Sequence, residues 1–422
     1  MLHHLISRRQ FIAAGALIAA GAATSACSTT PTAPGSAGAA DNGQGSTPAE
    51  QPQDTEIVEP EPEPEPEPQS ATDRLLETMT IEQKVAQLFI VTPEGLTGAS
   101  VATIAGSMTA DALARIPVGG ICYFGQNITG NQQLRDLLAG TLELSRNSGA
   151  GVPAFLSVDE EGGSLVARVA NSGHFDVPHF PNMIEIGATG DPSRAAEVGT
   201  QIGTYLRDIG FIVDFAPDAD VLTNPENPVI GARSFGSDAS VVAQMVSAEV
   251  EAMMATGVAP CVKHFPGHGD TAGDSHTGAV YTDRTADEIR ACELEPFRAA
   301  IAADVPFVMV GHIETPNFAD DGLPASLSPY MIGTVLREEL GFDGVVTTDS
   351  FSMGAITQNF APDDAAVQFL VAGGDVVLMP ADLELAYTGV LDAIETGVLT
   401  VERIDESVRR VLALKERLGL IA

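Results

Sequence analysis

Positive charge is scarce in this sequence. Its 422 residues carry 21 Lys and Arg against 57 Asp and Glu, which gives a net charge of −36. Binding to nucleic acid depends on neutralising phosphates with Lys and Arg, so the composition argues against a nucleic-acid partner. An anionic membrane surface is disfavoured for the same reason. The acidic balance favours solubility and says little about the fold.

Cysteine is also scarce, with four in the whole chain. Cys122, Cys261 and Cys292 lie far apart in apolar or mixed stretches, without the spacing of metal ligands. A disulfide scaffold is therefore excluded, and these three residues are expected to be small buried side chains. The fourth cysteine, Cys27, lies in the N-terminal region and differs from these three.

The N-terminal region lacks an apolar run long enough for a comfortable membrane span, because residues 11–23 are too few. Residues 7–12, SRRQFI, resemble a twin-arginine export motif. TSAC at residues 24–27 resembles a lipobox, although a Leu usually stands where Thr24 is. We expect residues 1–27 to be a signal peptide and Cys27 to be lipidated, which would place the protein at the outer face of a membrane. A signal peptide cut nearby, with secretion and an incidental Cys27, is the alternative.

Residues 28–70 contain almost no large apolar side chains and cannot form a core. Within them, residues 59–68 alternate strictly between Glu and Pro. Proline favours extended polyproline II and like charges repel, so we expect a semi-rigid, disordered spacer. The folded part is expected to be one catalytic domain at residues 71–422.

In residues 71–422, short apolar runs alternate with helical stretches, such as residues 193–209, 239–256, 285–303 and 329–340. Continuous apolar runs are typical of parallel strands that are buried on both faces. Eight such strand–helix units predict an α/β fold, a (β/α)₈ TIM-type barrel, with a doubly wound open sheet as the alternative. The eight predicted strands are residues 87–91, 119–124, 154–159, 211–217, 261–265, 307–313, 344–350 and 376–380.

Acidic and basic residues gather at the C-terminal ends of five of these runs, where a barrel builds its active site. They are Asp159, Asp218, Asp220, Lys263, His264, His312 and Asp349.

The densest group of such residues is the sequence KHFPGHGDTAGDSH at residues 263–276. Lys263 and His264 leave a strand, and a glycine-containing loop that we expect to be mobile follows. Its His and Asp residues suit a metal site by type, but the spacing lacks a helical His-x-x-x-His frame, and Lys263 would lie beside the ion. Alternatively, Asp274 and His276 form a dyad in which the carboxylate holds the imidazole tautomer for proton transfer.

Three further residues are candidates for the site. Asp349 ends the apolar run of residues 344–350, either facing the site or capping the next helix, a task that Ser350 could also serve. Asp159 precedes two acids and the pair Gly162-Gly163, where a backbone can approach a ligand closely. Arg233 is presented by a proline-containing loop, either into the site or as a surface Arg in a turn.

Together these segments resemble glycoside hydrolase family 3, in its single-domain β-N-acetylhexosaminidase branch, over residues 71–422. The resemblance implies that Asp349 is the nucleophile of a retaining glycosidase, with a covalent glycosyl–enzyme intermediate. It implies that His276, assisted by Asp274, is the acid/base, in place of the usual second carboxylate. The segments that carry it are MTIEQKVAQL at residues 79–88, NPENPVIGARSFG at residues 224–236, residues 263–276, and TTDSFSMGA at residues 347–355.

By the same resemblance, five side chains bind the terminal sugar: Asp159, Arg168, Arg233, Lys263 and His264. Four residues separate Gly163 from Arg168, one more than usual, so the direction of Arg168 stays open. The resemblance implies no cofactor and no metal. It implies a carbohydrate substrate with terminal β-linked N-acetylglucosamine, and an exported, tethered enzyme would meet peptidoglycan fragments.

Three alternatives remain at this point. A phosphorylase of the same family is one, because a neutral His tolerates an approaching phosphate better than a carboxylate does. A β-glucosidase or xylosidase specificity is another. From a different class, the protein would be an inactive glycan-binding surface lipoprotein.

Overall fold

The computed structural model describes residues 69–422. The predicted signal peptide, the lipidation site Cys27 and almost the whole spacer lie outside these residues, so those expectations stay predictions. The first described helix, α2 (Ala71–Thr78), begins one residue after Ser70, whose side chain accepts a hydrogen bond from the backbone N–H of Asp73. Such a cap satisfies a donor that the first turn leaves free.

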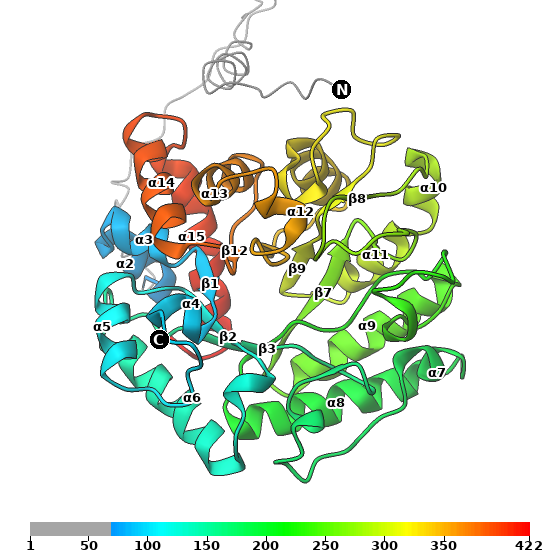
Figure 1. Ribbon diagram of the computed structural model, residues 1–422, viewed down its shortest axis with the longest axis horizontal. Helices are drawn as coiled ribbons and strands as arrows, with labels where there is room; N and C mark the ends of the chain where they lie inside the picture. Colours follow the sequence, from blue (N-terminus) through cyan, green and yellow to red (C-terminus); the bar gives the residue numbers. More distant parts are fainter. Residues whose placement is uncertain (1–68) are drawn as a thin grey trace, which may run out of the picture. The chain divides into compact units, whose positions relative to one another are not determined.

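Eight parallel strands form one sheet with the order β11-β9-β7-β6-β3-β2-β1-β12 (Figure 1). Its two ends meet, because the N–H of Val376, just before β12, donates to Val346 O of β11 at 3.0 Å, and the N–H of Thr348 donates back to Val376 O at 3.1 Å. The sheet is therefore a closed barrel, which confirms the predicted (β/α)₈ fold and rules out the open sheet. The strands are β1 (Phe89–Val91), β2 (Gly120–Tyr123), β3 (Phe155–Val158), β6 (Val213–Asp214), β7 (Ala259–Phe265), β9 (Phe307–Val310), β11 (Val345–Thr348) and β12 (Val377–Leu378).

All eight predicted strands are present, but most are shorter than predicted. The apolar run at residues 211–217 contains only the two-residue strand β6. The last residue of this apolar run, Pro217, has no N–H to donate to a neighbouring strand. An apolar run in the sequence thus predicts which residues are buried. A residue belongs to a strand only where its backbone forms hydrogen bonds to the neighbouring strands.

Helices surround the barrel (Figure 1). After α2 they are α3 (Ile81–Ala86), α4 (Pro93–Thr97), α5 (Ser107–Arg115), α6 (Asn131–Arg146), α7 (Met183–Gly187), α8 (Pro192–Ile209), α9 (Ala239–Ala255), α10 (Ala286–Ala291), α11 (Leu294–Ala302), the π-helix η6 (Tyr330–Glu339), α12 (Gly354–Thr357), α13 (Pro362–Val371), α14 (Leu383–Glu395) and α15 (Val401–Arg417). Four 3₁₀ turns, η2 (Gly125–Asn127), η3 (Ala170–Ser172), η4 (Gly231–Arg233) and η5 (Ala325–Leu327), lie between them. Two small sheets outside the barrel pair β4 (Glu160–Gly162) with β5 (Val166–Ala167), and β8 (Val280–Tyr281) with β10 (Ile313–Glu314).

The prediction of one helix at residues 285–303 is wrong. The chain forms α10 and α11, separated at Cys292, whose φ of −127° and ψ of −74° are not helical. Glu293 follows with its side chain 2% exposed. The pattern of apolar residues that predicts a helix continues through Cys292. The break in the helix, however, lets the carboxylate of Glu293 point into the interior.

The floor of the barrel is closed by a buried lysine. Lys415 of α15 donates hydrogen bonds to Gln87 Oε1 at 2.7 Å and Gly119 O at 2.9 Å. Its Nζ also lies 4.7 Å from the centre of the Phe155 ring. Burial lowers the pKa of Lys415 well below its ordinary value, because the charged form loses its hydration.

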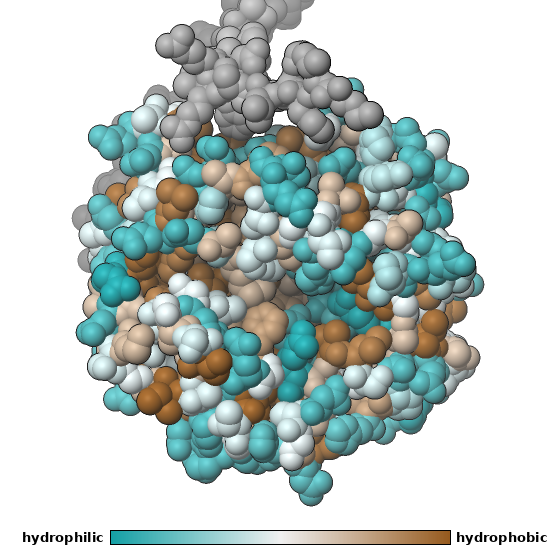
Figure 2. All heavy atoms as spheres, viewed as in Figure 1, coloured by the Kyte–Doolittle hydropathy of each residue, from teal (hydrophilic) through white to brown (hydrophobic). Residues whose placement is uncertain are grey.

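Hydrophilic residues dominate the margin of the face in Figure 2, and hydrophobic residues are scattered over it. None of the helices in residues 69–422 is both long and apolar enough to cross a membrane. The three cysteines of this part are free thiols, as predicted, with Cys122 and Cys261 buried and Cys292 half-buried.

Candidate active site

Four side chains, one each from the residue after β3, from β4, from η4 and from β7, form a buried charged cluster: Asp159, Glu161, Arg233 and Lys263. Lys263 Nζ lies 2.8 Å from Asp159 Oδ1 and 2.6 Å from Glu161 Oε1. Arg233 forms a two-pronged pair with Glu161, through Nε to Oε2 at 2.8 Å and Nη2 to Oε1 at 2.7 Å. Planar pairing of this kind fixes the guanidinium in direction as well as in position.

The cluster keeps its members charged. Burial alone would raise the pKa of Glu161, but Arg233 and Lys263 outweigh it and hold that pKa below its usual value. Burial alone would lower the pKa of Lys263, and the carboxylates of Asp159 and Glu161 reverse that shift. The cluster therefore presents fixed positive and negative groups with little water around them, which suits the hydroxyls of a sugar.

Replacing Glu161 by Gln is expected to lower the free energy of unfolding by about 3 kcal/mol, because two buried cations lose their shared carboxylate. Urea unfolding at neutral pH measures the loss. The matched control is Glu197→Gln, whose partner is Arg194 and whose side chain is 46% exposed, against 1% for Glu161. The control should change stability by less than about 0.5 kcal/mol. Equal effects in the two variants would contradict a stabilising role for the cluster.

His264, next to Lys263, is held by Asp220. Its Nδ1 lies 2.7 Å from Asp220 Oδ2. Burial lowers the pKa of His264 to about 4, so the ring is neutral at neutral pH. Because a carboxylate accepts hydrogen bonds, Nδ1 carries the proton and Nε2 remains an acceptor.

Asp218, Asp220 and His264 are also the described residues whose geometry would allow three ligands to one metal ion. However, Asp220 Oδ2 and His264 Nδ1 already bond to each other. Arg233 Nη2 lies 3.6 Å from Asp218 Oδ2 and supplies positive charge there. Burial, followed by the charge of Asp220, raises the pKa of Asp218 well above its ordinary value, which favours a proton on that carboxyl. The arrangement suits an internal hydrogen-bond network better than a cation site.

Asp349 lies directly after β11 and accepts a hydrogen bond at Oδ1 from the N–H of Ser350, at 2.7 Å. It does not cap a helix, since α12 begins at Gly354 with Met353 as its cap and without a side-chain bond. Burial would raise the pKa of Asp349, but His264, His312 and the Ser350 N–H outweigh it and keep that pKa below its usual value. The carboxylate is therefore ionised, as a nucleophile must be.

His312 fixes the backbone beside Asp349. Its Nε2 lies 2.9 Å from Ser350 O, a carbonyl that can only accept, so Nε2 carries the proton. Its Nδ1 accepts from Ser326 Oγ at 2.9 Å. The sequence marked His312 as a strand-end residue but gave it no role. The structure shows that it holds the carbonyl of Ser350, the residue whose N–H bonds to Asp349.

Asp274 and His276 form the predicted dyad. His276 Nδ1 lies 2.8 Å from Asp274 Oδ1, which also accepts the His276 N–H at 2.9 Å. Partial burial raises the pKa of Asp274, but the two hydrogen bonds from His276 outweigh it and leave that pKa below its ordinary value. The side chain of His276 is 65% exposed, so Nε2 is open to solvent and to a substrate.

Gly267 and Gly269, in the loop between His264 and Asp274, are packed closely against neighbouring residues. The sequence led us to expect a mobile loop, so the close packing was not predicted. A Cβ on Gly269 would come within 1.9 Å of Val221 O, and a Cβ on Gly267 within 2.7 Å of the Glu293 side chain. Gly267 also has a φ of +132°, which other residues rarely adopt. The glycines therefore let the loop lie against the chain that follows β6 and against the start of α11.

Arg168 is set apart from the charged cluster. Its guanidinium lies 5.5 Å from the centre of the Phe124 ring, and its Nε is buried without a hydrogen-bond partner. None of the ion pairs within residues 69–422 involves Arg168. Its predicted role in sugar binding stays a prediction, and its unsatisfied Nε leaves one donor for a ligand.

Sequence reasoning did not include Glu161, Asp220 or His268 among the predicted catalytic and sugar-binding residues, although it counted His268 among the possible metal ligands. The structure places all three beside the predicted residues. His268 Nδ1 lies 2.7 Å from Thr271 Oγ1, its Nε2 lies 3.1 Å from Ser275 Oγ, and its N–H donates to Asp220 Oδ1 at 2.6 Å. The available signal was their position, since Glu161 lies close to Asp159, His268 lies close to His264, and Asp220 follows the predicted strand at residues 211–217. Position alone does not show which partner each side chain takes.

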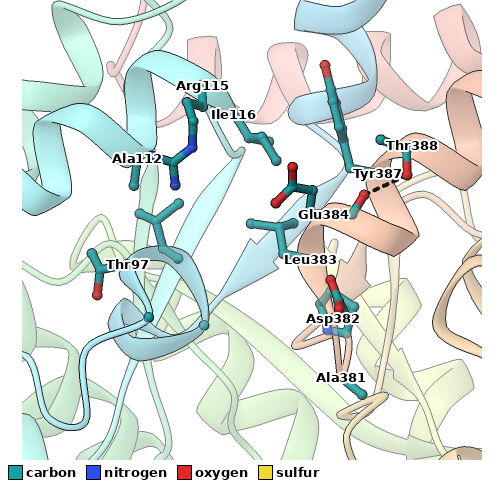
Figure 3. A pocket seen from close by; sticks show the side chains of 14 residues that line it. Thr97, Ala112, Arg115, Ile116, Ala381, Asp382, Leu383, Glu384, Tyr387 and Thr388 are labelled. Carbon is teal, nitrogen blue, oxygen red and sulfur yellow. Dashed lines mark hydrogen bonds between the residues drawn. The ribbon is translucent and has the colours of Figure 1, made fainter.

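A cavity of about 510 Å³ lies between α4, α5 and α14 (Figure 3). The side chains of Arg115 and Glu384 reach into it from opposite walls. None of the predicted site residues lines this cavity. The chemistry is therefore expected at the charged cluster, Asp349 and the dyad.

Comparison with known proteins agrees with this arrangement. The family described as "Glycosyl hydrolase family 3 N terminal domain" matches residues 80–414. The chain belongs to glycosyl hydrolase family 3. The resemblance noted in the sequence is thereby confirmed at the level of the family, over most of the barrel.

Relatives within family 3 are named for related activities. Beta-hexosaminidase A of Pseudoalteromonas piscicida is 35% identical over 350 residues, covering 77% of this chain and 58% of that protein. Beta-hexosaminidase LpqI of Mycobacterium tuberculosis is 34% identical over 306 residues, covering 69% of this chain and 76% of that protein. The solved β-N-acetylglucosaminidase of a Paenibacillus species has 38% identity and a TM-score of 0.76, covering 81% of this chain and 63% of that one. The chain thus spans about six-tenths of the length of two of these relatives.

Proposed function

We propose that the protein is a retaining β-N-acetylglucosaminidase that removes terminal β-linked N-acetylglucosamine from glycans. The observation that carries the proposal is an ionised Asp349 directly after β11, with the Asp274–His276 dyad in a turn whose backbone bonds to the chain that follows Asp349. The names of the relatives support the choice of sugar.

In the first step, Asp349 attacks the anomeric carbon and displaces the leaving alcohol. The bond from that carbon to the glycosidic oxygen breaks, and the oxygen takes the proton from His276 Nε2. Asp274 stabilises the protonated imidazole before transfer and keeps Nδ1 as the bonded side of the ring. Lys263, Arg233, Asp159 and His264 Nε2 hold the sugar hydroxyls in place.

In the second step, neutral His276 removes a proton from water, and the water oxygen attacks the anomeric carbon. The bond to Asp349 breaks, and the sugar leaves with its original configuration because two inversions have occurred. Asp349 returns to its ionised form and His276 to its protonated form, so protons and charges balance over the cycle.

The substrate assignment is tested with a panel of aryl β-glycosides. We expect the N-acetylglucosaminide to be turned over at least about tenfold faster than the glucoside or xyloside, because recognition of a polar substituent separates such analogues strongly. Release of the phenol in plain buffer and with inorganic phosphate is followed, together with the sugar product.

Each alternative gives a different result in that panel. Sugar 1-phosphate as the main product would make the protein a phosphorylase. Faster turnover of the glucoside or xyloside would overturn the sugar assignment. Binding of N-acetylglucosamine without turnover of any glycoside would identify a binding protein.

We further propose that the enzyme is exported and held at the outer face of the membrane by a lipid on Cys27. The support is the twin-arginine-like segment, the short apolar run and the spacer that follows. At that location the glycan at hand would be peptidoglycan fragments.

A further inference from the structure

The dyad sits in a tight turn that fixes its own shape. The N–H and the hydroxyl of Thr277 both donate to Asp274 O, at 3.0 and 2.9 Å. The imidazole of His276 is 65% exposed, and its hydrogen bond is to Asp274 within the same turn. Because the ring is mostly exposed and its partner Asp274 belongs to the same turn, its position relative to Asp349 depends on where the backbone of the turn is held.

That backbone is held by the segment Gly354–Gln358, which begins five residues after Asp349. The N–H of Gly354 donates to His276 O at 3.1 Å, and the N–H of Ala355 donates to Ser275 O at 3.1 Å. Gln358 Nε2 donates to Thr277 O at 2.8 Å. Three consecutive carbonyls of the turn are thus bound by one short stretch of chain.

The contact is close as well as hydrogen-bonded. A Cβ on Gly354 would lie 2.8 Å from His276 O and 3.0 Å from Thr277 C. The chain that leads into this segment is fixed to the barrel, because the N–H of Phe351 donates to Leu378 O and that of Asp349 to Val310 O, both at 2.9 Å. The nucleophile and the turn with the acid therefore rest on one rigid support.

We propose that Gln358 is a positioning residue for the general acid, acting through Thr277 O, and that Gly354 sets the distance of closest approach between the turn and the nucleophile's strand. This rests on the proposed roles of Asp349 and His276. Misplacing a proton donor by a fraction of an ångström weakens protonation of the leaving group without altering the charged cluster or Asp349. The loss should therefore depend on how much help the leaving group needs.

The test is Gln358→Met, which keeps the length of the side chain and removes the N–H donor. For aryl glycosides with poor leaving groups, kcat/KM should fall about tenfold, and with a dinitrophenyl leaving group it should stay within about twofold of wild type. The control is Gln244→Met on α9, because Gln244 is also exposed and its Nε2 donates to the backbone carbonyl of Ser240 at 3.1 Å. The control should leave the whole series unchanged.

A second pair of variants keeps the proposal falsifiable if Gln358→Met is silent. Gly354→Ala should show the same leaving-group dependence with a larger loss, on the order of 10²-fold, whereas Gly106→Ala, whose nearest neighbour would be 4.0 Å away, should not. A uniform loss across leaving groups, or no loss in either variant, would overturn the proposal. If the wild type prefers another glycoside, the sugar assignment fails, and the same series run on that glycoside still tests Gln358.

Discussion

Replacing Asp349 by Asn should lower kcat/KM on the order of 10⁴-fold or more, for good and poor leaving groups alike. The amide has the shape of the carboxylate, and its oxygen can still accept the hydrogen bond from the Ser350 N–H. What it lacks is the charge that attacks the anomeric carbon. The fold and the charged cluster should survive, and steady-state rates with thermal unfolding of the same preparation measure both.

The control for this variant is Asp343→Asn. Asp343 is exposed and precedes the same strand, so the change removes one carboxylate without touching the site. A second readout is covalent labelling, because a 5-fluoro glycosyl fluoride of the preferred sugar should modify Asp349. Labelling of another acid, or retained turnover in Asp349→Asn, would show that the nucleophile has been misassigned.

Replacing His276 by Ala should slow substrates with poor leaving groups by about 10²- to 10⁴-fold, the usual contribution of a general acid. With a dinitrophenyl leaving group the glycosylation step should stay close to wild type, because that phenolate leaves without a proton. Plotting the logarithm of kcat/KM against the pKa of the leaving phenol should give a steeper slope than wild type. The exposed His174, replaced in the same way, should leave the slope unchanged.

A parallel line on that plot would argue against His276 as the acid, because loss of a proton donor cannot affect all leaving groups equally. In that case the donor would have to be sought elsewhere. Glu293 would be the next residue to examine, since it lies under the same loop, next to Gly267. Burial raises the pKa of Glu293 to about 7, so a share of the molecules carries a proton there near neutrality.

The fold was predictable because each unit of the sequence carries the same signal. A strand buried on both faces needs a continuous apolar run, and the carboxyl ends of parallel strands meet at one rim. Asp159, Lys263, His264 and Asp349 can therefore be grouped from the sequence alone. The break between α10 and α11 was not predictable, because the pattern of apolar residues continues through Cys292 and Glu293.

The partners inside the site were much less predictable. Arg233 and Glu161 are 72 residues apart, and Lys263 and Asp159 are 104 apart. Which carboxylate each cation pairs with depends on strand register and loop direction. Neither can be predicted from the types of the residues. The extra residue before Arg168 was visible in the sequence, but its effect on the direction of the guanidinium needed the structure.

Lys415 has a consequence for the order in which the barrel forms. Its two hydrogen-bond acceptors, Gln87 and Gly119, lie 328 and 296 residues earlier in the chain. During synthesis the first strands emerge long before the helix that seals them, so their lower ends stay open to water until the last turns of α15 arrive. The floor of the barrel is therefore among the last parts to form, and a protein shortened by one helix at its C-terminal end should expose the side chains of its earliest strands.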